Sequence, residues 1–209
     1  MVMLLQAKNL TLNEVHQRLD LQPSVQRVRF TDVLNLPDLT EWEMAKMAQI
    51  RIDFQAYWQA GKVLEGQVQL LVLAPLLRLA GYYRSPVQLS LEQAIAEIML
   101  DDEDTKIKGR LDLLAARRDA VTPLWVLVVE SKNSQVDALN GLPQLLTYAS
   151  QSLTSQESVW GLATNGFSCY FVRLISGETL SYQLLPELNL LDSDRALVLL
   201  QVLKGILLQ

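Results

Sequence analysis

Two stretches near the amino terminus repeat apolar residues with a helical period and open on the same polar signature. Residues 11–19 and residues 40–60 each begin with a Thr followed three residues later by a Glu, which is the spacing of a capping box. Each stretch therefore predicts a helix. The polar residues 22–37 between them predict a connector, within which residues 28–30 fit a short strand.

Residues 62–79 are apolar on nearly every face, which predicts a third, buried helix that ends at Gly81. Pro75 should kink this helix or place a break near Ala74. Glu65 falls in line with the apolar residues of the stripe, where a carboxylate is costly unless it is paired, protonated or facing a cation. The alternative is that Glu65, close to the start of the helix, reaches solvent and favours the helix dipole.

Strand-like patterns follow. Residues 86–99 favour a strand, although their apolar pattern fits a helical period as well. Residues 101–104 predict a polar turn, and residues 107–115 a strand with strict alternation. One face of that strand would carry Ile107, Gly109, Leu111 and Leu113, and the other Lys108, Arg110 and Asp112. A hairpin turn at residues 117–120 would lead into the apolar strand 124–129.

The remaining pattern predicts one more helix, three strands and a final helix. Pro143 suits the first turn of a helix that runs to about Gln151. The strands are expected at residues 158–164, 167–175 and 179–185, and the first two are joined by Asn165-Gly166, which fits a type I′ hairpin turn. Asp192 or Ser193 would cap the last helix. This order of elements indicates an α/β fold with a mixed sheet.

Composition narrows the class of protein. The 209 residues are half apolar, so we expect one domain with a sizeable core. The single cysteine, Cys169, excludes a disulfide within the chain and argues against a cysteine-based metal site. No uncharged apolar run reaches the ~18 residues of a membrane span, which predicts a soluble, cytoplasmic protein. The net charge of −5 counts against a dedicated nucleic-acid binder but allows a locally basic site.

An acid and a base close the most apolar predicted strand. Glu130, Ser131 and Lys132 directly follow residues 124–129. Side chains two positions apart in a strand share a face, so Glu130 and Lys132 should project together, ~7 Å apart. Ligands of open α/β sheets often bind at such strand ends, which makes this position the first candidate for a site.

Asp112, on the preceding strand, is the second candidate carboxylate. Consecutive strands joined by a short turn should be sheet neighbours. In an antiparallel pair, however, Asp112 and Glu130 would lie at diverging ends unless the strand bends or bulges near Asp112. The alternative is that they form surface ion pairs with Arg110 and Lys132, which contribute little to stability. The bare pattern is short and common, and on its own it favours the ion pairs.

If the two carboxylates do meet, they cannot both stay ionised without a cation. Oxygen ligands without His or Cys favour a hard ion, Mg²⁺ or Mn²⁺. Lys132 would add a positive donor that orients or deprotonates a water and stabilises charge. Two carboxylates, a hard metal ion and a lysine suit phosphodiester hydrolysis.

Three short motifs follow one another along the chain. They are Gly109-Arg110-Leu111-Asp112, then Val129-Glu130-Ser131-Lys132, then Gln144 and Tyr148 in a Q-x-x-x-Y spacing. Together they resemble the PD-(D/E)XK nuclease superfamily, and the closest likeness is to the amino-terminal nuclease domain of type I restriction enzyme motor subunits. Weaker likenesses are Glu65 on the first core helix, Pro75-Leu76-Leu77 before Gly81-Tyr82, and Ala163-Thr164-Asn165-Gly166. The resemblance covers residues 62–175.

The resemblance implies a restriction-endonuclease-like mixed sheet flanked by helices. Residues 1–38 would be a helical amino-terminal extension, and residues 39–209 a single nuclease-like domain. Asp112 and Glu130 would bind Mg²⁺ or Mn²⁺, and Lys132 would be the catalytic lysine. Glu65 would be an auxiliary acid near the metal. Gln144 and Tyr148 would contact substrate phosphate or hold the site together, and Arg110 would contact substrate phosphate. Further basic residues expected near the phosphates are Lys106, Lys108, Arg117 and Arg118.

The sequence departs from the family pattern in two respects. Leu111 stands where the family often has Pro before the first acidic ligand, and no helicase or ATPase segment is present. The resemblance therefore implies a DNA endonuclease that acts alone, as a homodimer, or as a separate subunit of a restriction system. The alternative is the same fold without catalysis, used as a nucleic-acid-binding or assembly module.

Overall fold

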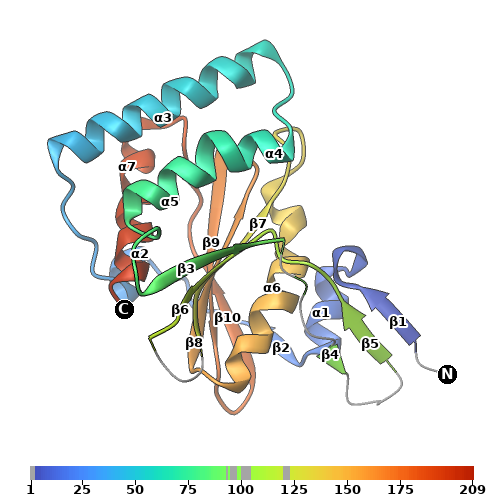
Figure 1. Ribbon diagram of the computed structural model, residues 1–209. Coiled ribbons are helices and arrows are strands. Elements are labelled where there is room, and N and C mark those ends of the chain that lie inside the picture. Colours follow the sequence, from blue (N-terminus) through green and yellow to red (C-terminus); the bar gives the residue numbers. More distant parts are fainter. Residues whose placement is uncertain (1–2, 93, 95–97, 100–104, 120–122) are drawn as a thin grey trace.

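The computed structural model describes residues 3–92, 94, 98–99, 105–119 and 123–209. The helices are α1 (Leu12–Arg18), α2 (Phe30–Val33), α3 (Glu41–Ala60), α4 (Glu65–Val68), α5 (Ala74–Ala80), α6 (Leu142–Ser150) and α7 (Ser193–Leu207). The strands are β1 (Met3–Gln6), β2 (Leu21–Pro23), β3 (Val87–Leu91), β4 (Ile98–Met99), β5 (Thr105–Lys108), β6 (Leu113–Arg117), β7 (Leu124–Ser131), β8 (Ser158–Thr164), β9 (Ser168–Ile175), β10 (Leu180–Leu184) and β11 (Leu188–Asn189). Figure 1 shows their arrangement.

One large mixed sheet organises the chain. Its strands run in the order β2-β10-β9-β8-β7-β6-β3, and β11 pairs with β9. The β7–β8 and β10–β2 pairs are parallel, and the other pairs are antiparallel. The predicted α/β class with a mixed sheet flanked by helices is therefore confirmed.

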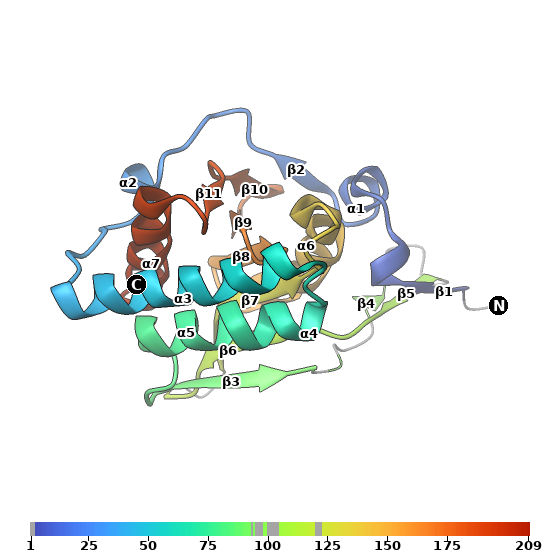
Figure 2. The same cartoon turned by 90° about the horizontal axis from the view of Figure 1, so that it is seen from above.

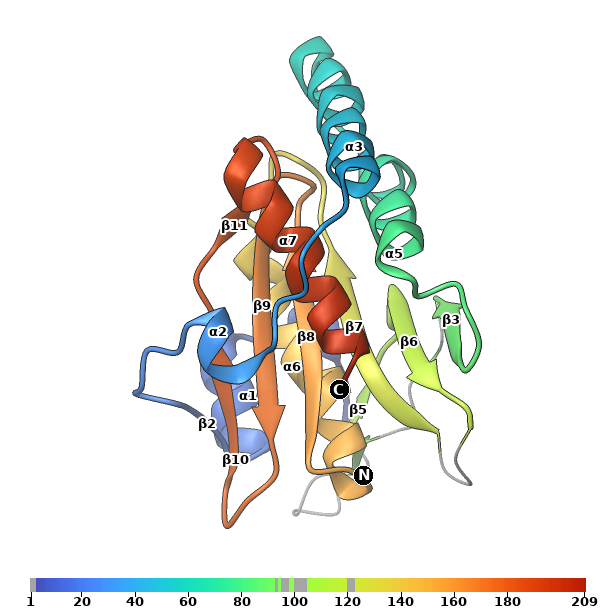
Figure 3. The same ribbon diagram turned by 90° about the vertical axis from the view of Figure 1, so that its left-hand side faces the viewer.

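Helices cover both faces of this sheet. Figure 3 shows α7 in front of the central strands and α6 behind them. Because side chains alternate along a strand, β7 feeds both cores: Leu127 and Val129 pack with α3, α5 and α7, and Val128 packs with α6. A strand buried on both faces reads as a continuous apolar run, which is why β7 was the clearest strand in the sequence.

The predicted third helix is one rod with a wide turn in it. α4 continues through a π-helical turn at Gln69–Leu73 directly into α5. The π turn precedes Pro75, which has no N–H to give to the helical ladder, so the predicted irregularity is present without a break in the rod. Gly81 ends the rod with φ of 100°, a conformation that glycine adopts easily.

Residues 107–115 do not form one strand, and this prediction was wrong. β5 ends at Lys108 and pairs with β1 and β4 in a separate three-stranded sheet. β6 begins at Leu113 and pairs with β3 and β7 in the large sheet. The alternating pattern continues across residues 109–112, but the two halves find different partners and the chain breaks between them.

Several boundaries also differ from the prediction. Residues 28–30 are not a strand, because Phe30 begins α2 and the strand in this region is β2. Residues 1–38 are not purely helical, since they supply β1 and β2; the division at residue 38 stays a prediction. Residues 86–99 contain two short strands, β3 and β4, and residues 93, 95–97, 101–104 and 120 lie outside the described part of the chain.

The β8–β9 connection is not a type I′ turn. A type I′ turn needs positive φ at both central residues, and here only Gly166 has one, of 102°. The Asn165 side chain instead accepts a hydrogen bond from the Ser168 N–H and donates one to the carbonyl of Val136. The capping boxes at Thr11 and Thr40 are confirmed, as are the starts of α6 beside Pro143 and of α7 at Asp192.

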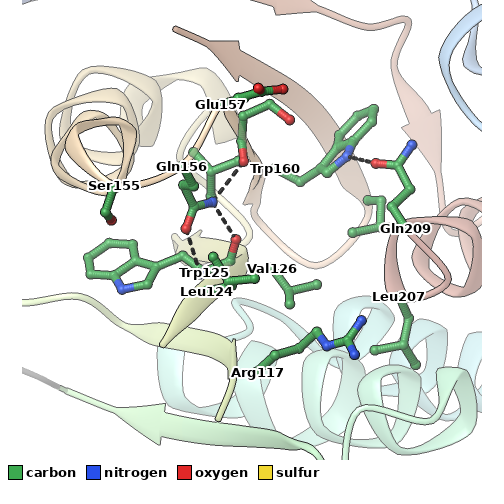
Figure 4. Close-up of a pocket in the computed structure, with 13 residues that line it drawn as sticks. Arg117, Leu124, Trp125, Val126, Ser155, Gln156, Glu157, Trp160, Leu207 and Gln209 are labelled. Carbon is green, nitrogen blue, oxygen red and sulfur yellow. Dashed lines mark hydrogen bonds between the residues drawn. The ribbon is translucent and has the colours of Figure 1, made fainter. Parts of the chain in front are cut away.

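The end of the sheet opposite the carboxyl end of β7 forms a pocket of about 460 Å³. Figure 4 shows hydrogen bonds formed by two of its side chains, Gln156 and Trp160. The Gln156 amide accepts from the N–H of Trp125 and donates to the carbonyls of Trp125 and Ser158. The Trp160 indole N–H donates to Gln209. These bonds tie the first residues of β7 and β8 together, which indicates a structural role.

Within the residues that the structure describes, no helix has the length and apolar character needed to cross a membrane.

Candidate active site

The break between β5 and β6 places Asp112 opposite Glu130. Leu113 pairs with Val129 in the antiparallel β6–β7 ladder, so the next position outward sets Asp112 across from Glu130. Asp112 thus lies just before the start of its strand, and the start of β6 meets the end of β7. The carboxylates were expected to diverge unless the chain bends near Asp112; the chain does break there, between β5 and β6, so both carboxylates line the same pocket.

Ser131 anchors the Asp112 carboxylate. Its backbone N–H and its hydroxyl both donate to Oδ2 of Asp112, at 2.7 and 2.8 Å. The Ser131 hydroxyl in turn accepts from the Gln69 amide at 3.0 Å. Gln69 begins the π turn of the helical rod, so this chain of bonds connects the helix layer to the carboxylate. Neither Ser131 nor Gln69 was expected from the sequence as part of a site.

Glu130 is a carboxyl group buried at the end of β7, with 1% of the residue exposed. Lys132 Nζ lies 2.5 Å from its Oε1, and the predicted shared face of the two residues is confirmed. Oε2 of Glu130 is buried and has no hydrogen-bond partner among the described residues. Burial, followed by the nearby charge of Asp112, raises the pKa of Glu130 to about 8, and Lys132 offsets only part of this rise.

Glu65 approaches the same place from the helix layer. It is the first residue of α4 and is exposed, so it does not lie on the buried stripe that the sequence suggested. Partial burial and the charge of Asp112 raise the pKa of the Glu65 carboxyl, and Lys132 lowers it. Its electrostatic neighbours are therefore Asp112 and Lys132, although solvent also reaches it.

α6 contributes Gln144 and Tyr148 from one face of the helix. The Tyr148 hydroxyl accepts a hydrogen bond of 3.1 Å from the backbone N–H of Arg110. Burial raises the pKa of Tyr148 to about 12. Gly109 allows this close approach, because a Cβ at that position would stand 2.6 Å from Cε1 of Tyr148.

The three acidic residues, Lys132, Gln144 and Tyr148 line one open pocket of about 540 Å³. The lining includes every site residue named from the sequence, which are Glu65, Arg110, Asp112, Glu130, Lys132, Gln144 and Tyr148. It also includes Gln6, Lys8, Lys108, Gly109 and Asn140. Lys108 was expected near the site, whereas Lys8 was not.

Lys8 comes from the amino-terminal segment. β1 pairs in parallel with β5, with Gln6 opposite Lys108, and the chain then turns so that Lys8 reaches the pocket rim. The small sheet thereby carries a basic rim of Lys8, Lys108 and Arg110. Arg110 also forms an exposed ion pair with Glu92, with 3.3 Å between Nη1 and Oε2, and such a pair contributes little to stability.

Other basic residues named from the sequence lie elsewhere. Arg117 lies at the far end of β6 and lines the pocket at the opposite end of the sheet, where it pairs with Asp119. Arg118 follows it, so the expectation that these two residues approach the same phosphates was wrong. Lys106 is not part of the pocket lining.

The side-chain oxygens of the pocket supply some, but not all, of the ligands that a hard cation needs. Two carboxylates face each other across β6 and β7, and one buried oxygen of Glu130 has no partner. Among the described residues, however, no three side chains of His, Cys, Asp or Glu are grouped closely enough to hold a metal ion by themselves. A cation would therefore bind to two carboxylates and complete its shell with water or substrate, which is how Mg²⁺ is commonly held.

Comparison with known proteins gives little guidance. No protein-family model matches the sequence, and no curated protein matches it. Among solved structures, the chain resembles a fragment of a protein described as an HsdR subunit of a type I restriction enzyme from Vibrio vulnificus YJ016, with 20% identity and a TM-score of 0.41. The match covers 66% of this chain and spans about a quarter, 25%, of that chain. A likeness this weak carries no functional argument, so function rests on the pocket itself.

Proposed function

We propose that this protein is a metal-dependent deoxyribonuclease with a restriction-endonuclease-like fold of the PD-(D/E)XK type. The observation that carries the proposal is the meeting of Asp112 and Glu130 beside Lys132 at the carboxyl end of β7. Lys8, Lys108 and Arg110 line the same pocket, which suits a phosphodiester substrate that must approach carboxylates.

Asp112 and Glu130 would hold the ion, Mg²⁺ or Mn²⁺. When bound, such an ion acidifies a water and neutralises charge on a phosphate oxygen. Ser131 fixes the Asp112 carboxylate through two hydrogen bonds, so that carboxylate is already oriented. Glu130 would supply the buried oxygen that has no partner of its own.

Lys132 is proposed to orient the attacking water and to stabilise charge as the phosphodiester bond breaks. Glu65 would accept a proton from that water or hold it in place, because its carboxyl interacts with the charges of Asp112 and Lys132. Arg110, Gln144 and Tyr148 would contact the substrate phosphate from the β5 and α6 sides. DNA as the substrate, other restriction-system subunits as partners and a homodimer remain predictions from the family resemblance.

A second candidate is the same fold without catalysis, binding nucleic acid or another subunit. The Lys132–Glu130 ion pair favours it, because a lysine that neutralises Glu130 can take the place of a cation. The two candidates differ in one respect that an assay can measure, namely whether divalent ions bring about DNA cleavage.

The test is cleavage of supercoiled plasmid and of single-stranded DNA with Mg²⁺ or Mn²⁺. Asp112→Asn and Lys132→Ala should each abolish cleavage, while Arg117→Ala, at the far end of β6, should cleave like the wild type. No cleavage by the wild type, or equal cleavage by all four proteins, would remove the proposal in favour of the silent binding module.

A further inference from the structure

A second concave surface lies at the other end of the helix layer. It is a groove of about 600 Å³ between the first half of α3 and the end of α5. Figures 1 and 2 show these two helices side by side. The groove lies at the α5 end of the helical rod, away from α4. Two aromatic residues, Trp42 and Tyr83, line it together with three cations, Lys46, Arg78 and Arg84. We call this surface the α3–α5 groove.

The charge of the α3–α5 groove has a single sign. Its lining contains no acidic residue. Within the described ranges of the chain, Lys46, Arg78 and Arg84 form no ion pair. The protein as a whole carries a net charge of −5, so three unpaired cations in one groove form a local site of opposite sign that attracts anions.

The aromatic rings are available for contact. Trp42 is 63% exposed and Tyr83 is 50% exposed, so neither ring is committed to the core. Lys46 Nζ lies 5.9 Å from the centre of the Trp42 ring, which keeps a cation beside an open π face. Exposed rings beside cations suit a ligand that alternates flat, apolar groups with negative charges.

Single-stranded nucleic acid has that chemistry, since its bases stack on aromatic rings and its phosphates pair with lysine and arginine. An acidic protein segment would satisfy the cations but would leave both rings without a flat partner. We propose that the α3–α5 groove binds a single-stranded stretch of nucleic acid, with bases on Trp42 and Tyr83 and phosphates on Lys46, Arg78 and Arg84.

The α3–α5 groove is separate from the candidate active site. The rod from Glu65 to Ala80 has about 1.5 Å of rise per residue, so its two ends lie on the order of 20 Å apart. The proposal therefore does not depend on cleavage.

The experiment measures binding of a fluorescent oligothymidylate of about 12 nucleotides to the full chain in EDTA, by anisotropy, because EDTA prevents metal-dependent cleavage. The variants are Trp42→Ala and the double charge reversal Lys46→Glu with Arg84→Glu. Matched controls are Trp58→Ala, an exposed tryptophan at the other end of α3, and Arg27→Glu, an exposed arginine in the β2–α2 connector. All these side chains are exposed, so the variants should fold, and circular dichroism checks this.

Trp42→Ala should weaken binding about tenfold through lost stacking. The charge reversal should weaken it further and reduce the slope of log affinity against log salt by about one or two, while both controls bind like the wild type. Equal binding by groove variants and controls would overturn the proposal. It would also fail if polyglutamate of equal charge displaced the oligonucleotide as effectively as unlabelled oligothymidylate does. If the wild type did not cleave DNA but its oligonucleotide binding were still weakened by the groove variants, only the proposed nuclease activity would be contradicted.

Discussion

The buried Glu130 carboxyl should make the stability of the metal-free protein fall as pH rises. Its pKa is raised from 4.5 to about 8 by burial and by Asp112, so folding takes up a proton between these values. A native state that binds more protons than the unfolded state loses stability with rising pH, at about 1.4 kcal/mol for each pH unit. The loss begins near pH 4.5, is complete above about pH 8, and amounts to at most about 5 kcal/mol.

Glu130→Gln removes this titration while keeping the size of the side chain. At about pH 5 the variant and the wild type should be similarly stable, because Glu130 is protonated in the folded protein. At about pH 8.5 the variant should be the more stable by roughly 2–5 kcal/mol. The assay is urea denaturation in EDTA at both pH values. Glu178→Gln, an exposed carboxyl between β9 and β10, should show no such change.

Adding Mg²⁺ provides the second half of this test. A ligand present at tenfold its Kd stabilises the folded state by about 1.4 kcal/mol, and the wild type at about pH 8.5 should gain this amount. Glu130→Gln should gain much less, because an amide is a poor ligand for a hard cation. Parallel pH profiles for wild type and variant would refute the assignment of Glu130 as a buried carboxyl with a raised pKa.

Three further substitutions test the surroundings of the pocket. Lys8→Ala should weaken DNA binding severalfold and lower the salt slope by about one, as loss of one phosphate contact does; an unchanged slope would mean that Lys8 does not contact DNA. Ser131→Ala removes one of two donors to Asp112 and should cost about 1.5–3 kcal/mol in urea denaturation, since hydrogen bonds to charged groups are strong. Gly109→Ala should displace the Tyr148 ring and destabilise the fold by about 1–3 kcal/mol, with lower cleavage; a wild-type Tm would contradict the close approach.

The sequence was most informative where burial dictates the residue pattern. β7 is buried on both faces and reads as an apolar run, so both the strand and the acid–base pair at its end were predictable. Capping residues fixed the starts of α1, α3 and α7, because the Thr or Asp side chain must accept a backbone N–H there. The shared face of Gln144 and Tyr148 followed from helical spacing alone.

The position of Asp112 could not be worked out locally. Alternation runs unbroken from Ile107 to Leu113, and only tertiary pairing separates β5 from β6. The pattern therefore placed Asp112 inside one strand that ran to residue 115, whereas Asp112 lies just before the start of β6. A pattern of period two does not show which sheet each half of a strand joins.

Lys8 was missed for a related reason. It lies about a hundred positions before Lys108 in the chain, and only the parallel pairing of β1 with β5 brings the two together. Parallel pairs between distant segments leave no short-range sequence signal. Ser131 was quoted as the variable residue of a motif, and its bonds to Asp112 appear only in three dimensions.

The most direct test of the central claim is a crystal soaked in Mn²⁺ and measured for anomalous scattering. We expect a peak between the carboxylates of Asp112 and Glu130, with oxygens of both residues at about 2.0–2.3 Å. The peak should vanish in a crystal of Asp112→Asn. No peak in the wild-type pocket, or an ion bound by only one of the two carboxylates, would contradict the claim that they form one cation site.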